Sequence, residues 1–294
     1  MNQNAPNQGS PSPGSPSRGS SSPGSGSVAL VGPGRAGTAL ARALVAVGHE
    51  VIAVAGRAPD APSVRGAAEE FAAHRRPVGA VANGADLVII ATPDAAISDV
   101  AEAVAGGLDV DALVLHCSGS RGLEVLAPIA AVRPDARLGG LHPLQTLPTG
   151  ALDEARLSGA WAAVTGPPEV GALAEQLGMR PFAILDEDRD RYHAAACIAS
   201  NHLVALLGQV ERVAAAAGVP FAAFEPLVRA TVDNVFALGP EAALTGPISR
   251  GDLSTVARHL AAVADDEQRA YRALAAAAAR LADRDDDAVR NVVG

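Results

Sequence analysis

Up to about residue 186, short apolar runs rich in valine and isoleucine alternate with longer alanine-rich stretches that mix apolar and polar residues. Short β-branched runs are typical of buried strands, and the mixed stretches are typical of amphipathic helices. The pattern predicts strands over residues 28–31, 51–55, 85–91, 113–115, 137–141, 161–165 and 181–185. After the first, second and third of these strands it predicts helices over residues 38–47, 67–73 and 97–104. Alternation of this kind indicates a doubly wound parallel sheet.

The pattern changes after Asp186, because no further strand-like run follows. The remaining sequence predicts helices over residues 189–217, 221–238, 253–264 and 265–282, with a loop over 244–252. We therefore expect an α/β Rossmann-type domain over residues 28–186 and an all-helical domain over 187–284. Residues 1–27 are rich in proline, glycine and serine, which is typical of a disordered tail, and residues 285–294 form an acidic tail.

A glycine motif lies between the first predicted strand and the first predicted helix. Its six residues fit G-x-G-x-x-G and are Gly32, Pro33, Gly34, Arg35, Ala36 and Gly37. In a dinucleotide site the first glycine allows the tight turn, the second lets a pyrophosphate approach the backbone, and the third lets the helix pack closely. The amino end of the helix then offers free N–H groups to the phosphates. The alternative is an ordinary turn between a strand and a helix.

The end of the second predicted strand indicates which dinucleotide binds. An NAD site usually has Asp or Glu there for the ribose hydroxyl, whereas this chain has Gly56-Arg57. An arginine can bind a 2′-phosphate bidentately, which favours NADP, although Arg57 can also be an ordinary surface residue. Thr92 and Pro93 follow the strand predicted to pair with the first one, so we expect them beside the dinucleotide.

Hydride transfer to a carbonyl or an imine also needs a proton donor. All 23 basic residues are arginine, so lysine is excluded and histidine becomes the leading candidate. His142 lies at the carboxyl end of a predicted strand, and Ser118 follows the strand expected beside it. Both positions suit a substrate site. The alternative is that His142 only caps its strand and Ser118 only forms a turn.

Two further groups of residues belong to the helical part. His193, Cys197 and Asn201 are spaced four apart, so an α-helix would present them on one face. His193 and Asn201 are candidates for substrate contacts, or else polar groups at a helix interface; His193 is the second candidate for the proton donor. Arg250 and Asp252 lie in the predicted loop and either bind a substrate carboxylate or form a local ion pair.

Composition excludes several classes of protein. The net charge of −9 argues against a nucleic-acid or anionic-membrane partner. The seven histidines lack metal-ligand spacing, and the two distant cysteines, Cys117 and Cys197, form no zinc motif, so we expect no metal site. Isolated cysteines and the lack of a signal-peptide core are consistent with the cytoplasm. The alanine-rich helical domain exposes more apolar surface than one small domain covers, so we expect a homodimer.

Several motifs together resemble a known group of proteins. They are VGPGRAG, ATPD, HCSG, LHPLQT, YHAAACIASNHL and ALTGPISRGDLSTVARHL, and they span most of residues 28–282. The chain resembles bacterial Rossmann-like proteins that carry a C-terminal helical domain of unknown function, within the 6-phosphogluconate dehydrogenase-like superfamily. That resemblance implies an eight-stranded nucleotide domain, a helical domain and a dimer, with kinship to ketopantoate and pyrroline-5-carboxylate reductases.

The resemblance also implies roles for particular residues. His193, Cys197 and Asn201 stand where ketopantoate reductases have a lysine and two asparagines, so only the last asparagine is kept. His142 and Ser118 are similar to the substrate-contacting histidine and serine of prephenate dehydrogenases. The leading hypothesis is an NADP-dependent oxidoreductase that acts on a small 2-oxo acid or imine. The alternative is a dinucleotide-binding sensor or scaffold without catalytic activity.

Overall fold

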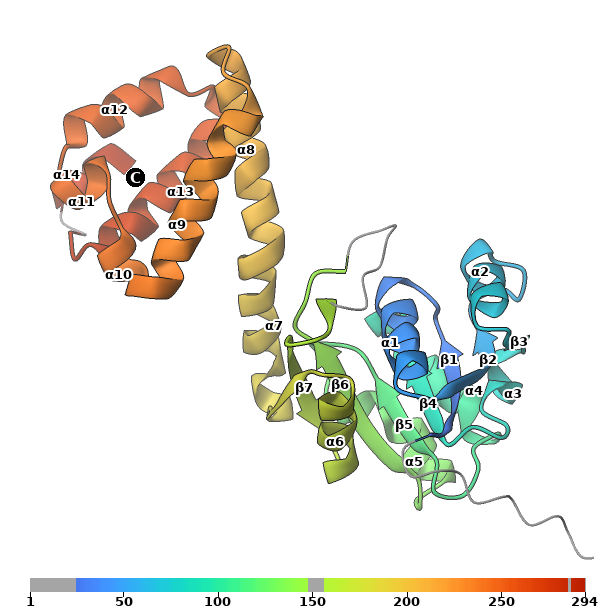
Figure 1. Cartoon of the computed structure of the whole chain (residues 1–294). Helices are drawn as coiled ribbons and strands as arrows, with labels where there is room; N and C mark the ends of the chain where they lie inside the picture. Colours follow the sequence, from blue (N-terminus) through green and yellow to red (C-terminus); the bar gives the residue numbers. More distant parts are fainter. Residues whose placement is uncertain (1–24, 148–155, 285–286, 294) are drawn as a thin grey trace, which may run out of the picture. The chain divides into compact units, whose positions relative to one another are not determined.

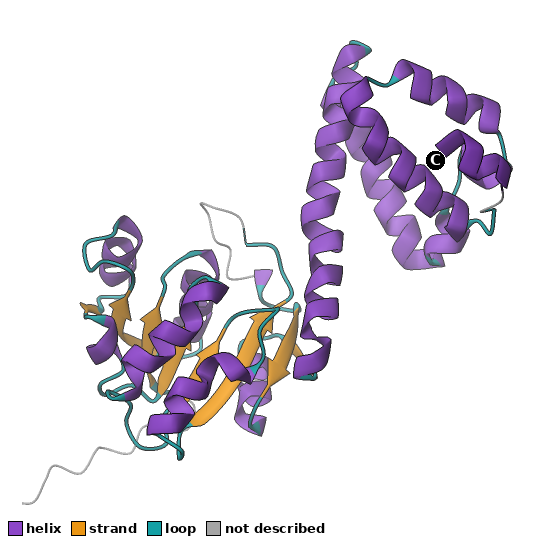
Figure 2. Ribbon diagram, turned by 180° about the vertical axis from the view of Figure 1, so that it is seen from behind, coloured by secondary structure: helices purple, strands orange, loops and turns teal. Residues whose placement is uncertain are grey.

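The structure is a computed structural model that describes residues 25–147, 156–284 and 287–293. The chain divides after Ala196 into two compact units, whereas the sequence placed its domain boundary after Asp186. Within the described residues every strand belongs to the first unit, and the second unit contains helices alone (Figure 2). Most of the expected N-terminal tail, residues 1–24, lies outside the described residues.

The first unit is built on one sheet of eight strands in the order β3-β2-β1-β4-β5-β6-β7-β8 (Figure 1). The strands are β1 Ser27–Val31, β2 Glu50–Ala55, β3 His74–Arg75, β4 Leu87–Ile90, β5 Leu113–His116, β6 Arg137–Pro143, β7 Trp161–Thr165 and β8 Arg180–Ala183. All neighbouring strands run parallel except β6 and β7, which are antiparallel. The doubly wound fold expected from the sequence is confirmed.

Helices cover both faces of the sheet. In the first unit they are α1 Arg35–Ala46, α2 Pro62–Glu70, α3 Val78–Val81, α4 Ile97–Ala105, α5 Ala127–Val132 and α6 Pro168–Gln176, with the 3₁₀ turns η1 Asp94–Ala96, η2 Leu123–Leu126 and η4 Asp186–Asp188. Helix α2 begins and ends earlier than expected, because Pro62 favours the first helical turn and Ala72 adopts a φ of +52°.

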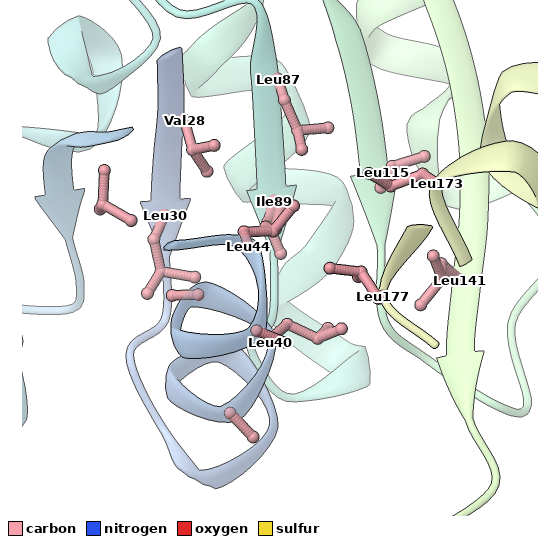
Figure 3. Packing of buried hydrophobic residues seen from close by; sticks show 14 of the residues in the cluster. Val28, Leu30, Leu40, Leu44, Leu87, Ile89, Leu115, Leu141, Leu173 and Leu177 are labelled. Carbon is pink, nitrogen blue, oxygen red and sulfur yellow. The ribbon is translucent and has the colours of Figure 1, made fainter. Parts of the chain in front are cut away.

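Successive residues of each strand point to opposite faces, which divides the core into two clusters. In β1, Leu30 belongs to the cluster that contains residues of α1, α2 and α6, whereas its neighbour Val31 belongs to the cluster that contains residues of α3, α4 and α5. Figure 3 shows the first cluster, in which Leu40 and Leu44 of α1 lie over the central strands and Leu177 lies near Leu141. Burial on both faces explains why these strands are continuously apolar.

The helix predicted over residues 189–217 is interrupted. It consists of α7 Arg189–Cys197, a π-helical segment η5 Ile198–His202, and α8 Leu203–Ala216. Helix α7 belongs to the first unit up to Ala196, and η5 and α8 belong to the second. The second unit continues with η6 Phe221–Phe224, α9 Glu225–Leu238, α10 Pro240–Ala243, α11 Pro247–Arg250, α12 Leu253–Ala262, α13 Asp265–Leu281 and α14 Asp287–Val293. A membrane crossing would need a longer and more apolar helix than any that the described residues form.

The end of the chain differs from the expected acidic tail. Residues 287–293 form α14, and Val289 is buried in the core of the second unit with Val256 and Ala279. Arg272 of α13 donates a hydrogen bond of 2.8 Å to the Val292 carbonyl. The acidic composition concealed this helix, because its valines, Val289 and Val292, gain their packing only from the core of the second unit.

Candidate functional site

The glycine turn joins β1 to α1 at the carboxyl edge of the parallel strands (Figure 1). Gly32 has a φ of +83°, and a Cβ atom on it would lie 2.8 Å from the Ala91 backbone. A Cβ atom on Gly37 would lie 2.6 Å from the Gly32 carbonyl oxygen, so this glycine lets α1 pack against β1. Gly34 is exposed, and a Cβ atom there would have open space around it. The three glycines therefore have the geometry that a dinucleotide turn requires.

The amino end of α1 is open to an anion. Gly34 is the N-cap of the helix, and no side chain caps it. Pro33 is buried beneath the turn, Arg35 is exposed, and Ala36 is half-buried. The first N–H groups of a helix lack partners within the helix and point toward such a ligand. These residues fit the pyrophosphate of a dinucleotide.

Arg57 lies beside this turn. Ala55, the last residue of β2, accepts a hydrogen bond of 2.9 Å from the Gly32 amide, and Arg57 follows two residues later. The Arg57 side chain is exposed, and within the described residues its guanidinium forms no hydrogen bond or ion pair. It is available to an anionic group at this end of the turn.

The segment after β4 borders the same turn. A Cβ atom on Gly32 would lie 2.9 Å from the Thr92 side chain, and Pro93 is exposed. The hydroxyl of Thr92 is buried and has no hydrogen-bond partner among the described residues. Thr92 and Pro93 therefore lie at the carboxyl edge of the sheet, in the segment beside the glycine turn, and their contact with a dinucleotide stays a prediction.

Strand pairing brings the candidate catalytic side chains onto one face of the sheet. His116 pairs with Gly140, and Gly140 pairs with Thr165. Two residues further along β6, His142 pairs with Ala163. Paired residues project to the same face, so each histidine has a small residue beside it. A Cβ atom on Gly140 would lie 2.9 Å from His116 and 3.1 Å from Arg189. Small residues thus leave room for α7 side chains.

His142 is the centre of this cluster. Its Nδ1 lies 2.7 Å from the Tyr192 hydroxyl, and its ring packs edge-on against that of His193, with centroids 6.0 Å apart. Burial, followed by the charges of His193 and Arg189, lowers the pKa of His142 to about 4, against a weaker opposing effect of Asp94. His142 is therefore a neutral imidazole at physiological pH.

Gly119 makes the histidine pair possible. A Cβ atom on Gly119 would lie 2.7 Å from His193 Nδ1 and 2.9 Å from His142 Nε2. Any other residue at this position would collide with both rings, since real Cβ contacts are longer. The two imidazoles therefore converge over the backbone of the turn that follows β5.

His116 lies deeper in the same cluster and is completely buried. Its Nδ1 accepts a hydrogen bond of 3.3 Å from the Ser118 amide. Burial and then the charge of Arg189 lower its pKa to about 4, so this ring is neutral too. Its position indicates a structural role at the end of β5.

Arg189 fastens the start of α7 to the sheet. The side chain is fully buried, and its guanidinium donates to Asp186 Oδ1 (3.3 Å), the Ser118 carbonyl (3.3 Å) and Thr165 Oγ1 (2.6 Å). Asp186 also accepts a hydrogen bond from the Leu123 amide. A buried charge needs partners of this kind, and here they come from three separate segments.

The Ser118 hydroxyl makes contacts within its own turn, and its role toward a substrate stays a prediction. Its Oγ accepts a hydrogen bond of 3.1 Å from the Arg121 amide, and Ser120 beside it donates to Asp94 Oδ2 at 2.7 Å. Ser118 is buried and lies within the turn that carries Gly119. Its hydroxyl supports the turn beneath the histidine pair.

His193 lies in the first unit, because the first turns of α7 pack against the sheet. The sequence had assigned this residue to the helical domain over residues 187–284. Asn201 lies in the π-helical segment of the second unit, a kind of segment often found at functional sites. Cys197 begins that unit, and no disulfide joins it to Cys117.

The loop with Arg250 and Asp252 belongs to the second unit. Asp252 is the N-cap of α12 and accepts hydrogen bonds from the Thr255 amide and hydroxyl at 3.1 and 2.7 Å. These bonds hold the pKa of Asp252 down, at about 2. Arg250 is exposed at the end of α11. Among the described residues, no group of three or more potential ligands has the arrangement of a metal site.

Sequence reasoning missed Tyr192, Arg189 and Asp94. Tyr192 directly precedes His193, and a tyrosine next to a candidate histidine was a usable signal. Arg189 had no signal, because an arginine at the start of a helix normally lies in solvent. Asp94 follows Pro93, just beyond the carboxyl end of the central strand β4. Its position was a usable signal, because ligands of open α/β sheets bind at this edge.

The matches to domain families agree with the two parts of the chain. Residues 13–142 match the Rossmann-like domain, and residues 168–278 match a domain of unknown function named DUF2520. The fold defines a Rossmann-type protein with a helical C-terminal region. In particular, the chain combines a Rossmann-like domain with a DUF2520 domain, which confirms the resemblance found in the sequence. The comparison with curated proteins gives no match.

Solved structures extend this similarity over most of the chain. A proposed NADP oxidoreductase from Bacteroides fragilis is 25% identical, with a TM-score of 0.76, covering 87% of this chain and 99% of the other. A protein from Thermotoga maritima is 26% identical, with a TM-score of 0.60, covering 90% and 98%. A pyrroline-5-carboxylate reductase from Streptococcus pyogenes shares the fold at 16% identity and a TM-score of 0.58, covering 87% and 99%.

Proposed function

We propose that this chain is an NADP-dependent oxidoreductase that reduces a small 2-oxo acid or an imine. The observation that carries the proposal is that the glycine turn after β1 and His142 on β6 both lie at the carboxyl edge of the same run of parallel strands, with β4 and β5 between them. Ligands of open α/β sheets bind at this edge. The similarity to the proposed NADP oxidoreductase of Bacteroides fragilis supports the same activity.

Each residue then has a chemical task. Gly32, Gly34, Gly37 and the amino end of α1 would hold the pyrophosphate, and Arg57 would hold the 2′-phosphate. A dinucleotide bound there supplies a hydride to the substrate. His142 donates a hydrogen bond and then a proton to the substrate atom that gains electrons, and His193 contacts the substrate beside it. Asn201, Arg250 and Asp252 stay candidates for further substrate contacts, as the sequence proposed.

The cofactor preference can be tested at Arg57. We expect Arg57→Ala to weaken NADPH binding by about 10- to 100-fold, since a charge-assisted hydrogen bond contributes about 1.5–3 kcal/mol. NADH binding should hardly change, because NADH lacks the 2′-phosphate. Fluorescence titration of both cofactors measures this, with Arg65→Ala on α2 as the matched loss of an exposed arginine. Equal affinities of the wild type for NADPH and NADH would contradict the proposal.

A dinucleotide sensor without catalysis is the second candidate. The observation that favours it is His193, which stands where related reductases keep a lysine. Turnover separates the two functions. Saturable NADPH oxidation with any 2-oxo acid, imine or aldehyde of a broad panel excludes the sensor. NADPH binding without oxidation across the whole panel would support it.

The proposal includes a cytoplasmic homodimer formed through the helical unit. Taken by itself, this unit leaves α9 without a buried residue. Leu227, Phe236 and Leu238 are 63%, 88% and 61% exposed, on more than one side of the helix. An apolar helix exposed to this extent normally packs against another surface.

We expect light scattering to give the mass of a dimer at micromolar concentration. Phe236→Arg should produce a monomer, because the charge would be buried at the interface. Glu241→Arg on α10 is the control, since it changes an exposed charge elsewhere in the unit. A monomeric wild type would contradict the dimer.

A further inference from the structure

Tyr192 is fixed in a direction that aims its hydroxyl at His142. The distance from this hydroxyl to His142 Nδ1 is 2.7 Å, and the two rings meet edge-on at 84°, with centroids 5.6 Å apart. On its other side Tyr192 packs against Phe182, with centroids 5.7 Å apart, and Phe182 packs against Trp161. The contacts along this row of rings restrict the rotation of the Tyr192 ring, so its hydroxyl stays directed at His142.

The direction of the hydrogen bond follows from the protonation states. Burial raises the pKa of Tyr192 to about 12 and lowers that of His142 to about 4, so both groups are neutral at physiological pH. Within the described residues, Tyr192 has no other hydrogen-bond partner for its proton. Donation from Tyr192 to Nδ1 satisfies that proton, and a neutral imidazole that accepts at Nδ1 carries its own proton on Nε2.

The charges around His142 favour an electron-rich ligand. The groups that act on His142 are His116 from β5, Arg189 and His193 from α7 and Asp94 from η1, and Asp186 from η4 acts on the neighbouring His116. Both carboxylates are engaged, Asp94 by Ser120 and Asp186 by Arg189. Arg189 is buried and permanently charged, so a second cation near His142 would be repelled.

We infer that Tyr192 is a positioning residue that holds His142 with its proton on Nε2, so that the site receives a carbonyl oxygen rather than a protonated imine. The inference rests on the proposed function and narrows its substrate class. A carbonyl oxygen has lone pairs that accept from Nε2–H, whereas a protonated imine has none and carries a positive charge. A 2-oxo acid combines the carbonyl with an anionic group and is therefore the favoured substrate.

The proton transfers balance as follows. When the substrate carbon gains a hydride, the C=O π pair moves to oxygen, and this oxygen takes the proton from His142 Nε2. His142 takes a proton at Nδ1 from the Tyr192 hydroxyl as Nε2 gives up its own. Afterwards the Nδ1 proton returns to the Tyr192 oxygen and Nε2 takes one proton from solvent, which restores both groups to their starting states. The carbonyl is reduced to an alcohol, and NADPH is the reductant that the proposed function supplies.

Nitrogen NMR of isotope-labelled histidine in the full-length protein tests the tautomer without any turnover. In the wild type we expect His142, assigned by its loss in His142→Gln, to show a protonated Nε2 and an unprotonated Nδ1. Tyr192→Phe keeps the ring and its packing but removes the donor, so the preference for Nε2–H should be lost. Tyr271→Phe is the matched control, because Tyr271 makes the same contact with His259 Nδ1, at 2.8 Å. It should leave His142 unchanged.

Two small molecules, each added together with NADP⁺, test whether the site prefers a carbonyl oxygen to a cation. Oxamate presents a carbonyl and a carboxylate and should shift the His142 Nε2 resonance. Pyrrolidine, a cyclic cation, should leave it unmoved. A proton on Nδ1 in the wild type, an unchanged tautomer in Tyr192→Phe, or a response to pyrrolidine rather than oxamate would overturn the inference. Absence of turnover across the substrate panel would count against the proposed function alone, since none of these measurements depends on it.

Discussion

His142→Ala is expected to lower kcat by about 10²- to 10⁴-fold while KM changes little. The reason is that His142 is held on a strand and by the Tyr192 hydroxyl, so its Nε2 is preorganised for the substrate atom that gains electrons. Misplacement of a catalytic group by about 1 Å can cost on the order of 100-fold, and deletion removes the group altogether. Steady-state NADPH oxidation with any substrate found in the panel provides the measurement.

His193→Ala is the comparison variant, and we expect it mainly to raise KM. The opposite pattern would exchange the two roles, and a wild-type kcat in both variants would remove histidine from the mechanism. The pH profile adds a second check. Because burial lowers the pKa of His142 to about 4, the ring stays neutral above that pH and should produce no step in kcat near 6.5.

Arg189→Met is expected to destabilise the first unit by about 2–4 kcal/mol, because the charged hydrogen bonds contribute about 1.5–3 kcal/mol and their partners are left without a donor. Methionine fills much of the space of the arginine but cannot donate to Ser118, Thr165 or Asp186. Urea unfolding followed by circular dichroism measures the loss. The free energy of unfolding of Arg189→Lys should lie between those of the wild type and Arg189→Met, since lysine keeps the charge but lacks the planar guanidinium.

Arg191→Met provides the matched control two residues away. Arg191 pairs with Asp188, but its side chain is 85% exposed, so the pair is screened by solvent and we expect no measurable change in stability. Equal effects of the two substitutions would show that the buried network does not fasten α7. In that case the positions of Tyr192 and His193 would need another explanation.

The periodicity of the sequence determined most of the fold. Continuous β-branched runs are typical of strands whose two faces are both covered by helices. The positions of most strands and the doubly wound class of the sheet could therefore be predicted. The glycine turn was predictable as well, since Gly32 and Gly37 occupy positions where a side chain would collide with the backbone. Such local constraints are written directly in the residue types.

Other features depended on partners distant in sequence. The two-residue strand β3 is too short to show a hydrophobic periodicity. Helix α14 is stabilised by Val289, which is buried in the core of the second unit. The π-helical segment η5 also lies inside sequence that reads as an ordinary helix.

The candidate site shows the same division. The sequence by itself proposed His142 and His193 as candidates by elimination of lysine, and it proposed Arg57 as a candidate because no acid stands at that position. Only the tertiary structure joined the two histidines with Tyr192 and Arg189, because Gly140, which pairs with His116 in the sheet, leaves space for the Arg189 side chain of α7. A histidine's partners and protonation depend on what surrounds it in three dimensions, and residue type alone does not specify those surroundings.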